Sequence, residues 1–497
     1  MAHVIVIGSG FGGSIAAKRF TEAGHTVELL EMGEDWRGPV ARGEVPQSAD
    51  PAFLFRLLRD YPHDYLLTKP KLLVAQGMGL GGGSLVYSAI HLRAPQIAFD
   101  GWPAGYTRAH LDPYYARVEA RLRVAPLPGV DEFPRSRAFI EGATAAGLPR
   151  PAPNPLALSG CTACGWCVPL CGFGKKTTMT HTYLADAERT GKLTVRTRRK
   201  AAYIARAGNR YRVACWKTDG VQRDYQRVND GPLVMVEGDK IVVACGAIES
   251  PVLLERSLAA ELPRGWEPLR TFPTARLGRG IDGTGDFLQG GFVPRAVDGF
   301  KGSVMMMHVD LGDFVLEDVH GIPVGATVML ETRPHGVNKA WGQAYKERFR
   351  DYGRHMLGVA IIGRSGPGTA NNISVRDKGG IAVTSTAAYT PPPGSLEAAR
   401  GLIKGLGGEL ADSPWELSKT AFTVHPVGGC AMGDDDTTDA VVSAGDLALR
   451  ENPGVHVIDG SVLPGSALRN PSHTISAVAE RAMDVILGVH PHDRWPA

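Results

Sequence analysis

The chain has 497 residues, of which 43% are hydrophobic and 21% are charged, and its formal net charge is +3. This length and composition indicate a globular protein of about two or three domains and exclude a disordered chain. The small net charge, without a basic stripe, excludes a nucleic-acid-binding protein and leaves no nucleic-acid partner to expect.

Three features of the sequence bear on its compartment. No run of about 20 apolar residues occurs, so no transmembrane segment is expected. The first residues lack the charged and apolar regions of a signal peptide. The seven cysteines, an odd number, do not suggest a disulfide scaffold. Together these features predict a cytoplasmic protein whose thiols stay reduced.

The N-terminal residues have the pattern of a strand, a glycine turn, a helix and a second strand. In HVIVIGSGFGG the residues Gly8, Gly10 and Gly13 give the spacing G-x-G-x-x-G, and Glu31 ends the second strand, TVELLE. These glycines permit a tight turn, a close approach of pyrophosphate and a close helix–strand contact, in that order. Glu31 can accept hydrogen bonds from a ribose, and the helix N-terminus attracts phosphate. The pattern predicts a dinucleotide site.

Three later segments have the same nucleotide-fold character. The stretch GMGLGGGSLVYSA (Gly77–Ala89) can turn backbone amides toward a phosphate or a flavin, and its candidate contacts are Gly79, Gly82, Gly83 and Ser84. Residues Lys240–Ser257 have the pattern of a strand, a turn at Gly246 and a helix. Residues Val455–Leu487 have the pattern of a strand, a loop and a helix with one apolar face. Nucleotide-binding segments are therefore spread over the whole chain.

Residues from about 290 to 420 have a different pattern. The stretch ISVRDKGGIAVTST contains two alternating runs joined by Lys-Gly-Gly, which predicts a β-hairpin. The whole pattern predicts an α/β protein. It combines a Rossmann-type domain assembled from discontinuous segments with a second domain built on a large antiparallel sheet.

Four cysteines stand close together in CTACGWCVPLCG. Cys161, Cys164, Cys167 and Cys171 have the spacing C-x2-C-x2-C-x3-C, which bacterial ferredoxins use to bind an iron–sulfur cluster. Three of them could hold a [3Fe–4S] cluster, whereas a [4Fe–4S] cluster needs Cys171 to fold back or a remote ligand. Zinc is the other metal option, although the spacing is tight for paired C-x2-C knuckles. A segment without metal is the remaining reading, and the iron–sulfur cluster is the favoured hypothesis.

Six motifs occur in the order found in one family. They are VIVIGSGFGGSIAAKRFTEAGHTVELLE, GMGLGGGSLVYS, LDPYYARVE, VVACGAIESP, HPVGGCAMG and VIDGSVLPGSALRNPSHTISAVAERAMD. In these motifs the chain resembles the glucose–methanol–choline (GMC) oxidoreductases, and most of all their bacterial cholesterol oxidase-like branch. The resemblance implies FAD, a flavin domain made of separate segments, and oxidation of an alcohol by hydride transfer to flavin N5.

The resemblance also implies roles for single residues. His425 matches the active-site histidine that serves as base, and Asn470 matches the asparagine that faces the substrate oxygen. Asp459 and Gly460 match the segment that contacts the ribityl chain and the flavin edge. The second glycine-rich stretch has no histidine, which implies non-covalent FAD. Tyr87 departs from the asparagine of well-known cholesterol oxidases, and this departure puts steroid specificity in doubt. Those enzymes also isomerise the steroid with a glutamate, for which Glu317 and Glu331 are candidates by region only.

The function expected from the sequence is FAD-dependent oxidation of a hydrophobic, sterol- or lipid-like alcohol. If the cluster is present, electrons are expected to pass through it to a protein or a quinone. The alternatives are a flavin-containing lyase or decarboxylase on the same fold, and an O2-using oxidase without a cluster. Residues 1–45, 70–120, 190–289 and 421–497 are expected to form the FAD-binding domain, and residues 46–69, 121–189 and 290–420 the substrate domain.

Overall fold

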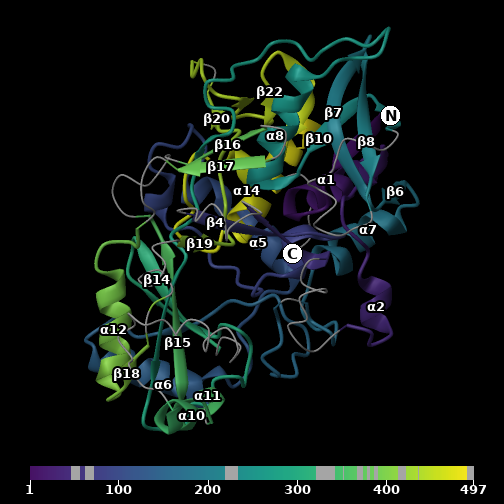
Figure 1. The fold of residues 1–497 in the computed structure, drawn as a ribbon. Coiled ribbons are helices and arrows are strands. Elements are labelled where there is room, and N and C mark those ends of the chain that lie inside the picture. Colours follow the sequence, from purple (N-terminus) through teal and green to yellow (C-terminus); the bar gives the residue numbers. More distant parts are fainter. Residues whose placement is uncertain are drawn as a thin grey trace.

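The computed structural model describes residues 1–45, 56–61, 72–168, 170–218, 233–320, 342–350, 352–365, 373–377, 381–385, 390–411, 413, 421–434 and 436–489. They form two bodies, one built around β1, β10 and α14 and the other around β14 and β15 (Figure 1). Within these ranges, no helix is long and apolar enough to span a bilayer.

The first body is built on a sheet in which five neighbouring strands, the last of them at the edge, are parallel. They are β1 (His3–Ile7), β2 (Thr26–Leu30), β6 (Leu193–Arg196), β10 (Lys240–Val243) and β23 (Asn452–Val457). The strands β20 (Met432–Gly433), β21 (Val442–Ser443) and β22 (Ala448–Leu449) extend it to eight strands in the order β20-β21-β22-β23-β10-β1-β2-β6. The middle strands are rich in Val and Ile and are buried, as a parallel sheet covered on both faces requires.

Helices from both ends of the chain cover this sheet together. Helix α14 (Ser472–Leu487) packs between α1 (Phe11–Glu22) and α5 (Arg108–Leu122), as Figure 1 shows. Buried Arg19 of α1 forms ion pairs with Glu480 and Asp484 of α14, and Arg117 of α5 contacts the same two carboxylates. Because each charge in this network is paired, the burial of Arg19, Glu480 and Asp484 is tolerated.

A three-stranded sheet and a helix complete the first body. The sheet consists of β7 (Arg199–Ala207), β8 (Arg210–Lys217) and β9 (Val234–Gly238), and α8 (Gly246–Ala259) packs against β7. The shorter elements are α2 (Arg37–Ala41), η1 (Gly82–Leu85), η2 (Gln96–Phe99), η4 (Met179–His181), α7 (Tyr183–Arg189) and η6 (Gly460–Val462).

The second body is a six-stranded antiparallel sheet, as the sequence predicted. Its order is β18-β12-β15-β14-β13-β5, from the strands β5 (Ala152–Pro153), β12 (Phe287–Phe292), β13 (Met307–Asp310), β14 (Phe314–Val319), β15 (Met356–Gly363) and β18 (Glu409–Leu410). The helices α6 (Pro134–Ala145) and α12 (Ser395–Gly405) pack on it and on each other. The elements η3 (Val130–Glu132), α10 (Gly342–Arg350) and α11 (Tyr352–His355) also belong to this body.

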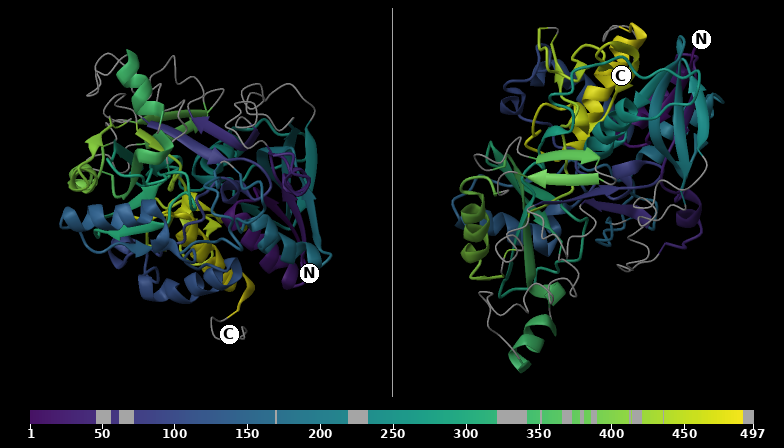
Figure 2. Two further views of the ribbon diagram at one scale, coloured as in Figure 1. Left: turned by 90° about the horizontal axis from the view of Figure 1, so that it is seen from below. Right: turned by 45° about the horizontal axis from the view of Figure 1, so that its top comes forward.

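Two small sheets lie between the bodies. One pairs β11 (Arg279–Ile281) with the hairpin of β16 (Ile373–Asp377) and β17 (Ile381–Ser385), which Figure 2 shows as light-green arrows at mid-height in its right-hand view. The predicted hairpin is thereby confirmed, although its turn lies outside the described residues. The other sheet joins β3 (Leu58–Tyr61), β4 (Leu72–Gly77) and β19 (Ala421–Thr423), with β19 parallel to β4. This parallel pairing brings the start of the second glycine-rich region near the loop that carries His425.

A buried ion pair ties α6 to the antiparallel sheet. Arg135 and Asp318 are both fully buried, and Arg135 Nε donates to Asp318 Oδ2 over 2.9 Å. Arg135 also donates to the carbonyls of Gly299 and Ser303. Asp318 Oδ1 accepts from the backbone amides of Met306 and Met307 at 2.6 and 2.7 Å. Both charged groups are therefore hydrogen-bonded within the protein.

We expect Arg135→Ala to lower the free energy of unfolding by about 3–5 kcal/mol, because the carboxylate of Asp318 stays buried without its partner. Arg137→Ala, two residues away on the exposed side of α6, is the matched control and should have little effect. Chemical denaturation of the three proteins measures the difference. Equal losses for the two variants would contradict the assigned role of the ion pair.

Candidate active site

The first glycine turn has the geometry that its spacing predicted. Gly8 has φ +95°, and a Cβ there would lie 2.2 Å from the carbonyl oxygen of Ala244. A Cβ on Gly13 would lie 2.0 Å from the Gly8 oxygen, whereas a Cβ on Gly10 would meet no protein atom within 4 Å. Open space at Gly10, at the N-terminus of α1 and with no side-chain cap, suits a phosphate group.

Glu31 follows β2 and lies beside this turn. Its Oε2 accepts from the backbone amide and the hydroxyl of Ser9, at 3.1 and 2.5 Å, and its Oε1 accepts from the Gly33 amide at 2.9 Å. Burial raises the pKa of the carboxyl, and these hydrogen bonds act in the opposite direction. The sequence placed Glu31 at the ribose position of a dinucleotide, and the structure places it within the turn that would hold that nucleotide.

The second glycine-rich segment touches the first through backbone atoms. A Cβ on Gly82 would lie 2.7 Å from the Gly10 Cα, and one on Gly33 would lie 2.4 Å from the Gly79 amide nitrogen. The Ser9 hydroxyl accepts from the Gly81 amide at 2.9 Å. Only glycines allow this approach. Of the predicted contacts, Gly82 therefore lies directly against Gly10, and Gly79 lies against Gly33, beside the place where a dinucleotide would bind.

Asp459 links three parts of the nucleotide fold. It follows β23, and its Oδ2 accepts from the Gly246 amide at 2.8 Å and the Ser250 hydroxyl at 2.5 Å. Its Oδ1 accepts from the Ser461 amide at 2.8 Å. The carbonyl of Gly460 accepts from the Gly428 amide at 2.9 Å. The segment predicted to contact the ribityl chain is therefore fixed to the start of α8 and to the loop after His425.

His425 forms a close pair with an aspartate that sequence analysis did not identify. Its Nδ1 lies 2.6 Å from Asp286 Oδ1, and its backbone amide donates to the Thr423 hydroxyl at 3.0 Å. Burial lowers the pKa of His425, but the charge and hydrogen bond of Asp286, together with the charge of Glu317, outweigh burial and raise it. The imidazole therefore lies in a region of negative electrostatic potential.

Asn470 and Glu317 stand next to this histidine from two other elements. Asn470 precedes α14 and is 6% exposed, and its Oδ1 has no hydrogen-bond partner among the described residues. Glu317 lies on β14 with 0% exposure, and neither of its carboxyl oxygens makes a hydrogen bond of good geometry there. Burial raises the pKa of Glu317 to about 8, and the His425 ring and the Asn470 amide oppose that rise. Polar groups without partners therefore converge at one point between the two bodies.

Backbone strain marks both loops that reach this point. Thr284 has φ +55° and Leu468 has φ +56°. Side chains with a Cβ, and β-branched ones above all, rarely adopt such values. Arg469 holds the second loop in place, since it donates to Asp310 Oδ1 at 2.7 Å and to the carbonyl of Gly312 at 3.2 Å. Strained residues that are held by their surroundings concentrate at functional sites.

The four clustered cysteines do not form a metal site in this structure. All four are free thiols, and among the described residues no group of three or more His, Cys, Asp or Glu side chains is placed to hold a metal ion. Burial raises the pKa of Cys161, and that of Cys167 to about 11, which disfavours the thiolate that metals bind. The iron–sulfur assignment of Cys161, Cys164, Cys167 and Cys171 thus has no support here, and no chemical step is derived through a cluster.

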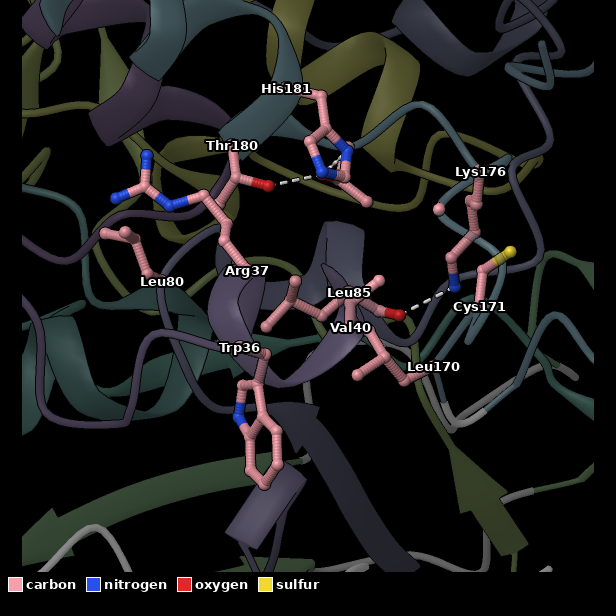
Figure 3. A pocket seen from close by; sticks show the side chains of 12 residues that line it. Trp36, Arg37, Val40, Leu80, Leu85, Leu170, Cys171, Lys176, Thr180 and His181 are labelled. Atoms are coloured by element: carbon pink, nitrogen blue, oxygen red, sulfur yellow. Dashed lines mark hydrogen bonds between the residues drawn. The ribbon is translucent and has the colours of Figure 1, made fainter. Parts of the chain in front are cut away.

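Cys171 instead lines an apolar pocket beneath the second glycine-rich segment, together with Trp36, Leu85, Leu170 and Lys176 (Figure 3). Lys176 is buried and donates to the carbonyls of Leu85, Tyr87 and Cys167 at 2.6, 2.9 and 2.6 Å. Burial lowers its pKa to about 8. All three hydrogens of the ammonium group are used, so this lysine joins the cysteine segment to the glycine-rich segment.

Sequence reasoning missed Asp286 and Lys176 and considered Glu317 only by region. Asp286 and His425 are 139 positions apart, and DGTGD is indistinguishable from an ordinary turn. The positions of both residues depend on how the two bodies meet, which local patterns do not encode. Glu331, the other candidate glutamate, lies outside the described residues.

A parallel nucleotide-binding sheet beside an antiparallel sheet, with a histidine between them, is the layout of a two-domain flavin oxidoreductase. The particular family follows from its sequence models: the N-terminal model described as GMC oxidoreductase matches residues 3–265, and the C-terminal model matches residues 409–479. This chain belongs to the GMC oxidoreductase family. It is an FAD-dependent oxidoreductase that acts on alcohol donors.

Individual relatives agree with this assignment. An uncharacterised GMC-type oxidoreductase of Mycobacterium tuberculosis is 26% identical, over 98% of this chain and 77% of that protein. An oxygen-dependent choline dehydrogenase of Pseudomonas aeruginosa is 25% identical, over 99% of this chain and 96% of that protein. The crystal structure of pyridoxine 4-oxidase from Mesorbium loti has a TM-score of 0.67 at 17% identity, covers 99% of this chain and 100% of its own, and shows the fold. These similarities do not single out the cholesterol oxidase-like branch.

The raised pKa of Glu317 makes stability depend on pH in a defined direction. In the unfolded chain this carboxyl ionises near its ordinary pKa of 4.5, whereas in the folded chain it keeps its proton up to about pH 8. The unfolded state then binds fewer protons between these values, so the stabilising contribution is full below pH 4.5 and is lost as pH rises toward 8.

Glu317→Gln removes this loss, since glutamine imitates the protonated acid. We expect the variant to gain stability relative to the parent by up to about 1.4 kcal/mol per pH unit over that window. Denaturation at pH 5 and at pH 8 measures the difference, with Glu397→Gln on the exposed side of α12 as control. A difference that does not change with pH would show that Glu317 is ionised in the folded protein.

Proposed function

We propose that this protein oxidises an alcohol by hydride transfer to N5 of non-covalently bound FAD, with His425 as base and Asn470 holding the substrate oxygen. The observation that carries this proposal is the convergence of His425, Asn470 and Glu317 between the two bodies, next to the segment that contains Asp459 and Gly460. Bound FAD supplies the hydride acceptor.

The proposed roles follow from what each side chain can do. His425 has Nδ1 engaged by Asp286, so Nε2 remains to take the hydroxyl proton of the alcohol. The Asn470 amide can donate a hydrogen bond to the oxygen as it gains negative charge. Burial of the surrounding groups keeps water from competing for these contacts.

The proposed cofactor contacts are those near the two glycine segments and the end of β23. The open space on the Cβ side of Gly10, with Gly82 packed against the Gly10 backbone, supports a pyrophosphate beside this pair of glycines. On this proposal the dinucleotide is held by Gly8, Gly10, Gly13, Glu31, Gly79, Gly82, Gly83, Ser84, Gly246, Asp459 and Gly460. The predicted division into an FAD-binding and a substrate domain is part of the same proposal.

Two classes of alcohol are candidates for the substrate. A sterol- or lipid-like substrate rests on the motif resemblance, whereas the relatives named above act on choline and pyridoxine, which are small polar alcohols. The test panel therefore contains both sterol- or lipid-like alcohols and small polar alcohols. An electron-accepting protein or quinone remains part of the proposal, and an iron–sulfur relay remains a sequence-based hypothesis without a step in this mechanism.

Anaerobic mixing of the holoenzyme with this panel tests the function. We expect one class of alcohol to bleach the flavin absorbance, and His425→Ala to slow that reduction by about 10²-fold or more if the histidine is the base. His110→Ala, on an exposed side chain of α5, is the control. If no alcohol bleaches the flavin, the lyase or decarboxylase alternative takes precedence, and an unchanged rate in His425→Ala would exclude the base role.

The cofactor proposal has a separate test at Gly10. A Cβ there meets no protein atom within 4 Å, and φ is −65°, so Gly10→Ala should leave the stability of the apoprotein unchanged. The methyl group would occupy the phosphate position, so FAD affinity should fall by at least about tenfold, or about 1.4 kcal/mol. Flavin fluorescence titration and thermal denaturation measure the two quantities, with exposed Gly445→Ala as control. Unchanged affinity would place the pyrophosphate elsewhere.

A further inference from the structure

Asp286 makes three hydrogen bonds with the segment that carries His425. Its Oδ1 lies 2.6 Å from His425 Nδ1. Its Oδ2 accepts from the Thr423 hydroxyl at 2.7 Å and from the Val424 amide at 2.9 Å. A carboxylate can only accept hydrogen bonds, so Nδ1 is the donor and carries the ring hydrogen. The unprotonated nitrogen of the neutral ring is then Nε2.

We propose that Asp286 is the positioning residue of this site, which fixes the tautomer and the orientation of His425 so that Nε2 faces the alcohol. This proposal rests on the proposed function in one respect, which is that the group giving its proton to His425 is the hydroxyl of an alcohol. Asp286 acts through His425 and does not touch the substrate.

The loop that contains Asp286 is held in its conformation by hydrogen bonds to its surroundings and not by the backbone preference of its residues. Thr284 has φ +55°, which is costly for a β-branched residue. Its amide donates to Asp282 Oδ1 at 3.0 Å, and its hydroxyl donates to the His425 carbonyl at 3.1 Å. Asp282 and Val427 exchange two backbone hydrogen bonds of 2.9 Å. The segments on either side of His425 and Asp286 are therefore locked together, and this strain supports a functional reason for the pairing.

Electrostatics favours the same role. Asp286, just before β12, and Glu317, on β14, are the ionisable groups whose charges act on His425, and Asn470 is the neutral polar neighbour. Among the residues that the structure describes, Glu317 makes no hydrogen bond of good geometry with the ring, so it is Asp286 that selects which nitrogen carries the hydrogen. The carboxylate also stabilises the positive charge that the ring acquires when it takes a proton.

The proton and electron balance is simple. The alcohol loses its hydroxyl proton to Nε2 and a hydride from its carbon to bound FAD, and it becomes a carbonyl compound. His425 becomes an imidazolium whose Nδ1 hydrogen still points at Asp286. Asp286 keeps its charge throughout, as in other histidine–aspartate pairs, so it needs no proton of its own.

The first test uses histidine-labelled holoenzyme without substrate. Nitrogen-15 NMR distinguishes the two ring nitrogens, and His425→Gln identifies the signals by their loss. We expect hydrogen on Nδ1 in the neutral ring and a titration midpoint above the ordinary value of about 6.5. Hydrogen on Nε2, or a midpoint below that value, overturns the proposal without any Asp286 variant, so a variant that fails to fold does not block the test.

The second test uses Asp286→Asn in the kinetics of flavin reduction. His425 must be neutral to accept a proton, so kcat/KM falls as pH drops below the pKa of His425. Loss of the Asp286 charge lowers that pKa, so the acid limb should move to lower pH, while the plateau falls by about 10²-fold because the tautomer is no longer fixed. Exposed Asp313→Asn is the control, and in Glu317→Gln the tautomer should stay as in the parent.

The outcomes separate the two proposals. If the parent enzyme is reduced by an alcohol but Asp286→Asn keeps both the plateau and the acid limb, Asp286 has no positioning role. A loss of rate without any shift of the acid limb or of the tautomer indicates a structural role only and also overturns the proposal. If no alcohol reduces the flavin, the proposed function fails, and the NMR measurement still decides whether Asp286 sets the tautomer.

Discussion

The backbone pairing of Asp282 with Val427 is the contact on which the site depends. It joins the loop before the antiparallel sheet to the loop that follows β19, and so helps to fix one body to the other beside the site. His425 and Asp286 lie on the two sides of this bridge, and the Thr423 hydroxyl adds a second link through Asp286. Because backbone hydrogen bonds set the spacing, the 2.6 Å contact between imidazole and carboxylate is a consequence of how the bodies meet.

The cofactor side of the site depends on a different constraint, which is that the chain segments there can meet only through glycines, since these have no side chains. Gly82 approaches Gly10 so closely that a Cβ on Gly82 would clash with the Gly10 Cα, whereas a Cβ on Gly10 would enter the open space beside them. The alcohol side is the reverse, since it gathers buried polar atoms without a hydrogen bond of good geometry among the described residues, above all the carboxyl oxygens of Glu317 and Oδ1 of Asn470. Unsatisfied buried groups cost stability, so their retention indicates that a ligand completes them.

Features of the fold and the site could be predicted from the sequence where the residues that determine them lie close together in the chain. The strand–turn–helix around Gly8, Gly10 and Gly13 is local, so its geometry followed from spacing alone, and the hairpin over 373–386 was equally local. The family motifs, which are local as well, led to His425 and Asn470. The partnership of Asp286 with His425 is set by contacts across 139 positions and had no local signature. The cysteine run shows that ligand spacing alone does not establish a metal site, because among the described residues no group of three or more ligands is placed to hold a metal ion, and the predicted cluster stays a hypothesis.

The order of the central strands has a consequence for biosynthesis. β1, β10 and β23 are neighbours in the sheet, yet they begin at residues 3, 240 and 452. β10 therefore lacks its neighbour β23 until almost the entire chain has left the ribosome. The pairing of these central strands depends on contacts between residues that are distant in sequence. Such topologies fold slowly and expose apolar strand edges while incomplete. This protein should therefore depend on chaperones during synthesis, and truncation near its C-terminus should yield aggregated chains that cannot take up flavin.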